Sequence, residues 1–140
     1  MRNFSAYELV DRETYEQMGE GALALFRPSA LKALDDLRDY FGVPVTVNNW
    51  RSGGPFQWRG FRTREKATAL GSPNSMHAHG KAFDCDIKGI TASNARVRIL
   101  DDQDNPLLRR ITRLEAGVNW VHFDLRTLSP GVERIYLFRA

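Results

Sequence analysis

One stretch of alternating apolar and polar side chains, from Lys81 onward, constrains the fold of this chain more than any other feature. Successive side chains of a β-strand point to opposite faces of its sheet. One face of the predicted strand is apolar and belongs to a core; it carries Phe83, Cys85 and Ile87. The opposite face is free to contribute to a functional site; it carries Ala82, Asp84 and Asp86.

A second alternating stretch lies within residues 118–126, which we expect to form the second strand of a hairpin with residues 110–115. Ala116 and Gly117 supply the turn of this hairpin. The apolar face points inward and carries Val121, Phe123 and Leu125. His122 and Asp124 then share the other face with the aromatic ring of Trp120.

The remaining elements complete an α+β pattern. Apolar residues at helical spacing predict a helix over residues 30–41, and a second helix is expected over residues 91–100. Short strands are expected over residues 43–49 and 134–138, with a long functional loop after the first. We therefore expect one domain over residues 1–140, with a central antiparallel sheet, flanking helices and the site on a sheet face.

Composition limits the chemistry of that site. Hydrophobic residues make up 42% and charged residues 26%, which is typical of globular proteins and excludes disordered and membrane classes. The single cysteine excludes an internal disulfide and a cysteine-based zinc finger. A metal site would have to use the three histidines and carboxylates.

His77 and Asp84 lie seven positions apart, and Gly80 between them allows a sharp turn that could bring both side chains to one ion. His122 would complete the set from a distant strand. Two histidines and one carboxylate are the usual protein ligands of a catalytic zinc site, which leaves the fourth position for water. A nearby His and Asp pair also occurs by chance, so the surrounding pattern decides.

That pattern resembles a known family. The run Ser75-x-His77-x-x-Gly80-x-Ala82-x-Asp84 is followed by Trp120-Val121-His122-Phe123-Asp124. Both runs resemble the motifs of the M15 family of zinc peptidases, which includes D-Ala-D-Ala carboxypeptidases and phage endolysins and shares its fold with hedgehog domains. The run Asn49-Trp50-Arg51-Ser52 is similar to the family's "YRS" segment, with Trp in place of Tyr. The resemblance extends over residues 45–126.

The resemblance implies that His77, Asp84 and His122 hold a zinc ion. It also implies that Arg51 acts on the substrate within the catalytic site and that Ser75 lines the same cleft. Trp120, beside the last ligand, is a further candidate for substrate contact. A guanidinium suits a substrate carbonyl or carboxylate because it offers a planar fork of donors.

The general base departs from the family pattern. Many members carry an acid three positions before the last ligand, but Asn119 stands there, and an amide cannot accept a proton. Glu115, across the predicted hairpin, is the preferred catalytic base, although it could equally be a solvated carboxylate. Asp124 is the other candidate for the base, but it is better placed to orient a ligand. His79 could be a fourth ligand, which would close the site around a structural metal.

The loop from Arg51 to Lys66 mixes aromatic and basic residues. Such a loop suits a peptidoglycan strand, with sugar rings on the aromatics and carboxylates on the arginines. It could also bind single-stranded nucleic acid, or its aromatic rings could belong to the core. Its proximity to the His and Asp pattern favours peptidoglycan, so no nucleic acid is expected.

Cys85, on the apolar face, is interpreted as a buried thiol and not a nucleophile.

We therefore expect a zinc-dependent peptidase that hydrolyses stem peptides of bacterial peptidoglycan, as a carboxypeptidase or an endopeptidase and as a possible phage endolysin. The alternative is a catalytically inactive zinc-binding domain of the same fold that serves as a cell-wall-binding or virion structural module. We expect a monomer, made in the cytoplasm without a signal peptide, with no membrane partner. It would reach the wall after release or be carried by a phage particle. The sequence leaves open which bond is cleaved.

Overall fold

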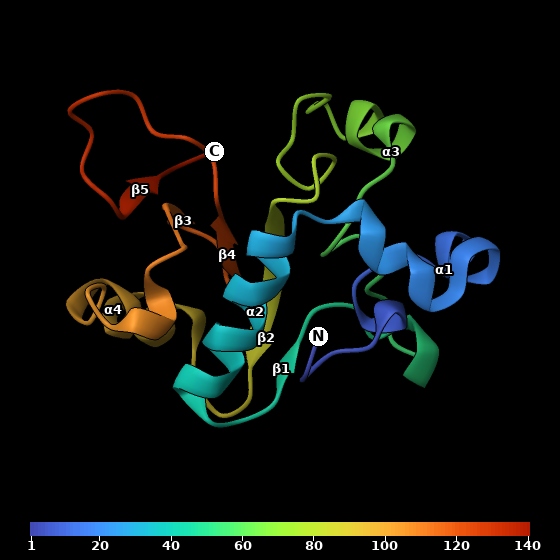
Figure 1. The fold of residues 1–140 in the computed structure, drawn as a ribbon, viewed down its shortest axis with the longest axis horizontal. Helices are drawn as coiled ribbons and strands as arrows, with labels where there is room; N and C mark the ends of the chain where they lie inside the picture. Colours follow the sequence, from blue (N-terminus) through green and yellow to red (C-terminus); the bar gives the residue numbers. More distant parts are fainter.

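The computed structural model describes residues 1–140 and confirms the α+β class (Figure 1). Five strands form one sheet in the order β1-β2-β4-β3-β5. Their bounds are β1 Val45–Thr46, β2 Ala82–Ile87, β3 Arg113–Glu115, β4 Val121–Asp124 and β5 Tyr136–Phe138.

Three of the four strand pairs are antiparallel, as expected, and β5 runs parallel to β3. The parallel pair follows from the connection between β4 and β5. Residues 125–135 lead the chain back along the sheet, so β5 runs opposite to β4, which is itself antiparallel to β3. The sheet is therefore mixed at this edge.

Helices flank the sheet (Figure 1). Their bounds are α1 Arg12–Met18, α2 Pro28–Phe41, α3 Arg64–Ala69 and α4 Ala92–Asp101, with short 3-10 turns at Ala6–Glu8, Gly19–Leu25, Trp50–Ser52 and Pro106–Leu108. The helix expected over residues 30–41 begins two residues earlier, because Pro28 occupies its first turn. The helix expected over residues 91–100 begins after Thr91, whose side chain accepts a hydrogen bond from the Asn94 amide. None of the helices combines the length and the apolar composition that a membrane span requires.

The core lies between the apolar face of the sheet and α2. Phe83, Cys85, Val121 and Phe123 all belong to it, as the alternating patterns predict. The register sets Phe83 opposite Phe123 and Asp84 opposite His122. The two predicted site faces are therefore continuous across β2 and β4.

Cys85 is completely buried in this core. Burial, aided by the nearby carboxylates of Asp84 and Asp86, raises the pKa of its thiol well above the ordinary value. A thiol held in its neutral form is a poor nucleophile. The position of Cys85 agrees with its interpretation as a structural residue.

The first 27 residues carry no pattern that predicts their structure, yet they pack into the core and hold the long loop in place. Phe4, Leu9 and Val10 are buried. The Phe61 amide donates to the Leu9 carbonyl at 2.9 Å, and the Asn48 side-chain amide donates to the Val10 carbonyl at 3.0 Å. The N-terminal segment therefore fixes both ends of residues 48–61.

Candidate metal centre

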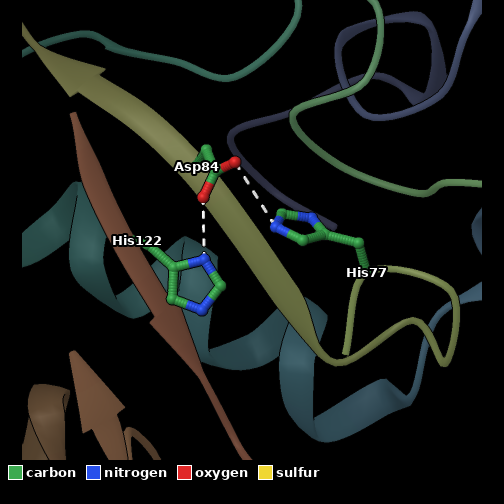
Figure 2. Close-up of side chains that lie close together, drawn as sticks. All are labelled: His77, Asp84 and His122. Atoms are coloured by element: carbon green, nitrogen blue, oxygen red, sulfur yellow. Dashed lines mark hydrogen bonds and ion pairs between the residues drawn. The ribbon is translucent and has the colours of Figure 1, made fainter. Parts of the chain in front are cut away.

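Three side chains from separate parts of the chain converge on the sheet face (Figure 2). His77 comes from the turn before β2, Asp84 from the middle of β2 and His122 from β4. Each offers one ligand atom, and the three atoms lie within 4.8 Å of one another. All three residues are buried, at 3%, 5% and 7% exposure. Imidazole and carboxylate groups gathered in this way form a set that can hold a metal ion.

The ring of His77 has a fixed orientation. Its Nδ1 lies 2.8 Å from the Gly60 carbonyl, and because a carbonyl can only accept, Nδ1 carries the hydrogen. Nε2 then directs its lone pair toward Asp84, with 3.4 Å between Nε2 and Oδ2.

Gly80 shapes the turn that presents His77, as its place between His77 and Asp84 in the sequence predicts. Its φ is +67°, in the left-handed region, and a Cβ there would lie 2.3 Å from the Leu25 carbonyl oxygen. Any other residue would be strained at this position and would also clash with the chain after α1. A glycine is therefore required for the turn to pack as it does.

His122 has a carboxylate on each ring nitrogen. Nδ1 lies 2.8 Å from Oδ1 of Asp84, and Nε2 lies 2.8 Å from Oδ2 of Asp124. Burial lowers the pKa of His122, but the hydrogen bonds to Asp124 and Asp84 outweigh it and raise the pKa to about 9. For Asp84 the signs are reversed, since burial raises the pKa of a carboxyl group. The two neighbouring histidines outweigh burial and bring the pKa of Asp84 below its usual value.

A cavity of about 500 Å³ opens onto these residues. Ser75, Glu115 and Trp120, three of the residues that the sequence analysis selected, line it together with His77, Asp84 and His122. Arg62 and Arg126 also line it, and neither of their side chains forms an ion pair with Asp124. The cavity therefore combines the candidate metal site with a carboxylate and cationic groups.

The structure does not bring Arg51 to this cavity. Arg51 is exposed, and its guanidinium lies 4.2 Å from the centre of the Tyr7 ring. Tyr7 belongs to the N-terminal segment, whose packing the sequence pattern does not predict. Arg62 lies at the site instead, where its Nη2 is 3.2 Å from Oδ2 of Asp84. It is one of several arginines in the loop, and its spacing gives no signal that separates it from the others.

Two further residues lie outside the cluster. His79, considered as a fourth ligand, is exposed and is not part of the group of three. Asn119, at the position where many family members carry an acid, lines a different cavity beside Cys85. A carboxylate at position 119 would therefore face away from His77 and Asp84, whereas Glu115 lines the cavity beside them.

The aromatic rings of the long loop contact its own basic residues. The Arg59 guanidinium lies 3.8 Å from the centre of the Phe56 ring, and the Lys66 ammonium lies 5.3 Å from the Trp58 ring. The Trp50 indole donates to the Val10 carbonyl at 2.8 Å. These rings therefore have partners within the loop itself and in the N-terminal segment.

Comparison with known proteins identifies one family. The model of a family described as Peptidase M15 matches residues 2–124, which include the whole cluster and the N-terminal segment. No curated protein and no solved structure matches the chain. The matched region extends well before residue 45, where the motif resemblance begins, and ends before β5.

Proposed function

The chain belongs to the peptidase M15 family, and we propose that it is a zinc-dependent peptidase that hydrolyses stem peptides of bacterial peptidoglycan. In this proposal His77, Asp84 and His122 hold the zinc ion. The observation that carries the proposal is the convergence of three buried ligand atoms within 4.8 Å beside a cavity of about 500 Å³.

The donor chemistry supports zinc. Two imidazole nitrogens and one carboxylate oxygen form a ligand set that zinc accepts readily, and three protein ligands would leave a fourth position for water. Hydrogen bonds from the far side of each imidazole ring set which nitrogen faces Asp84. Zinc, when bound, supplies a Lewis acid that polarises a carbonyl and lowers the pKa of water.

Glu115 is the proposed general base. The register sets Leu114 opposite Phe123, so one residue further along β3 the side chain of Glu115 falls level with His122. Its carboxylate lines the cavity and can accept a proton from the attacking water and pass it to the leaving amine. The Arg62 guanidinium is close enough to interact with Glu115 electrostatically, so a cation lies beside the proposed base.

Substrate contacts are proposed for Ser75, Trp120 and Arg62. All three line the cavity, and Arg62 takes the role that the resemblance implied for Arg51. Arg126 adds an exposed cation at the same cavity. Cationic groups around a peptide cleft suit the stem peptides of peptidoglycan, because these peptides carry carboxylates.

The alternative is a zinc-binding module of the same fold without hydrolytic activity. The sequence feature behind this alternative is Asn119, since many family members carry an acid there; in the structure position 119 lines a different cavity from the ligands, so the role of Glu115 decides between the two functions. The two functions differ in one respect that can be measured: both predict zinc binding, and only the peptidase releases products from murein.

Digestion of purified peptidoglycan tests the proposal. We expect the zinc-loaded chain to clear a peptidoglycan gel, to lose this activity with a chelator and to regain it with zinc. His77→Ala should abolish clearing, whereas His79→Ala, which alters an exposed histidine two residues away, should retain it. Mass spectrometry of the products would identify the bond. Failure of the zinc-loaded chain to release any product would contradict the peptidase and favour the binding module.

A further inference from the structure

We propose that Arg113 is a positioning residue of the metal centre, acting through Asp124 to hold His122 with Nδ1 directed at Asp84. The inference rests on the proposed function, since it concerns the same zinc site. It adds a support made of Arg113, the buried Asp124 and Phe138, none of which touches the ion in this proposal.

The support begins with a two-point ion pair. Arg113 lies directly opposite Asp124 in the antiparallel pair of β3 and β4. Its Nε donates to Oδ1 at 2.9 Å and its Nη2 donates to Oδ2 at 2.7 Å. Asp124 is completely buried, so its negative charge is stabilised by Arg113 and His122 and not by water. Two parallel hydrogen bonds fix both the position and the tilt of the carboxylate.

The fixed carboxylate in turn determines which nitrogen of His122 faces Asp84. Oδ2 of Asp124 lies 2.8 Å from Nε2 of His122. A charged carboxylate can only accept, so Nε2 carries a hydrogen, and Nδ1, which faces Asp84 in the cluster, is the nitrogen that would serve as the ligand atom. Loss of the carboxylate's orientation would allow the ring to rotate or to change tautomer, and either would misdirect Nδ1.

Phe138 holds the other side of the arginine. The Arg113 guanidinium lies 3.9 Å from the centre of the Phe138 ring, and the same ring meets His122 edge-on at 5.6 Å. Phe138 is kept in place by β5, since the Ala116 amide donates to the Phe138 carbonyl at 2.7 Å. This strand lies beyond residues 2–124, so the support includes a segment outside the family match.

Lysine cannot reproduce this geometry. A guanidinium is flat, so it can bind both carboxylate oxygens and stack on a ring at once, whereas an ammonium is a single point charge. Arg113→Lys therefore keeps the charge next to the buried Asp124 and removes only the two-point contact and the stacking. The variant separates positioning from charge.

Zinc affinity of the full chain, measured by competition with a chromogenic chelator, tests the inference. We expect Arg113→Lys to bind zinc about 10–100-fold more weakly than the wild type, as is typical when an outer partner of a metal ligand is removed. The matched control is Arg110→Lys, which alters an arginine paired with Asp36 away from the site and should leave the affinity unchanged. The visible spectrum of the cobalt-loaded chain should change in Arg113→Lys and not in the control, because it reports ligand geometry.

The possible failures are distinguishable. Absence of zinc binding by the wild type would overturn the proposed function and the inference together. Zinc binding by the wild type with equal affinity and an unchanged cobalt spectrum in Arg113→Lys would overturn the inference alone. Phe138→Leu keeps the buried ion pair and serves as a second variant if Arg113→Lys does not fold. It should also weaken zinc binding and shift the cobalt spectrum, and an unchanged affinity and spectrum would contradict the support.

Discussion

Replacement of Glu115 by glutamine is expected to lower the turnover of murein peptides by roughly 10²–10⁴-fold, the usual contribution of a general base. Glutamine has nearly the same shape as glutamate but cannot accept a proton, so the cavity should stay intact. Zinc affinity should not change, because Glu115 lines the cavity and is not one of the three clustered ligands. The measurement is turnover of a soluble stem peptide at saturating zinc, with zinc content determined on the same sample.

Two variants make this experiment decisive. Glu133→Gln alters an exposed glutamate outside the cavity and should retain full turnover. Asp124→Asn alters the other candidate for the general base. Because we expect this variant to bind zinc more weakly, its turnover is measured at saturating zinc. Wild-type turnover in Glu115→Gln together with a large loss in Asp124→Asn would assign the base to Asp124.

Zinc is expected to stabilise the folded chain strongly, and the effect should disappear in Asp84→Asn. The three ligands come from a turn and two strands, so they are brought together only in the folded state. A ligand that binds only the folded state at about 100 times its Kd adds roughly 2.7 kcal/mol to the free energy of unfolding. For a domain of this size that corresponds to a rise in Tm of roughly 5–10 °C.

Thermal unfolding with and without zinc measures this effect. The matched control is Asp86→Asn, which alters the next residue on the same face of β2, where the exposed carboxylate pairs with Arg59 at 2.8 Å. We expect the wild type and Asp86→Asn to show the same rise in Tm with zinc, and Asp84→Asn to show almost none. A rise in Tm with zinc in Asp84→Asn that equals the rise in the wild type would exclude the proposed site.

The strands and the ligand cluster could be predicted because their signals are local. Alternation alone assigned Phe83 and Cys85 to the core and Asp84 to the opposite face, and the structure places all three so. The pairing of β2 with β4 then brings Asp84 and His122 together, since both lie on the same face at opposite positions.

The remaining features depend on contacts between distant segments, which no local pattern encodes. Arg51 contacts the Tyr7 ring of the N-terminal segment, and the arginine of the long loop that lines the cavity is Arg62. Likewise, Phe138 reaches His122 only because β5 pairs with β3 after a long connection. A motif identifies residue types at set spacings and does not report which of several arginines faces a site.

The measurement that most directly tests the central claim is hydrolysis of a defined stem peptide as zinc is added back to the chelator-treated chain. We expect no product without zinc, a rise in rate in proportion to bound zinc, and saturation at one zinc per chain. The same titration of His122→Ala should give no product. Saturation of the wild type at one zinc per chain with no hydrolysis would contradict a zinc peptidase.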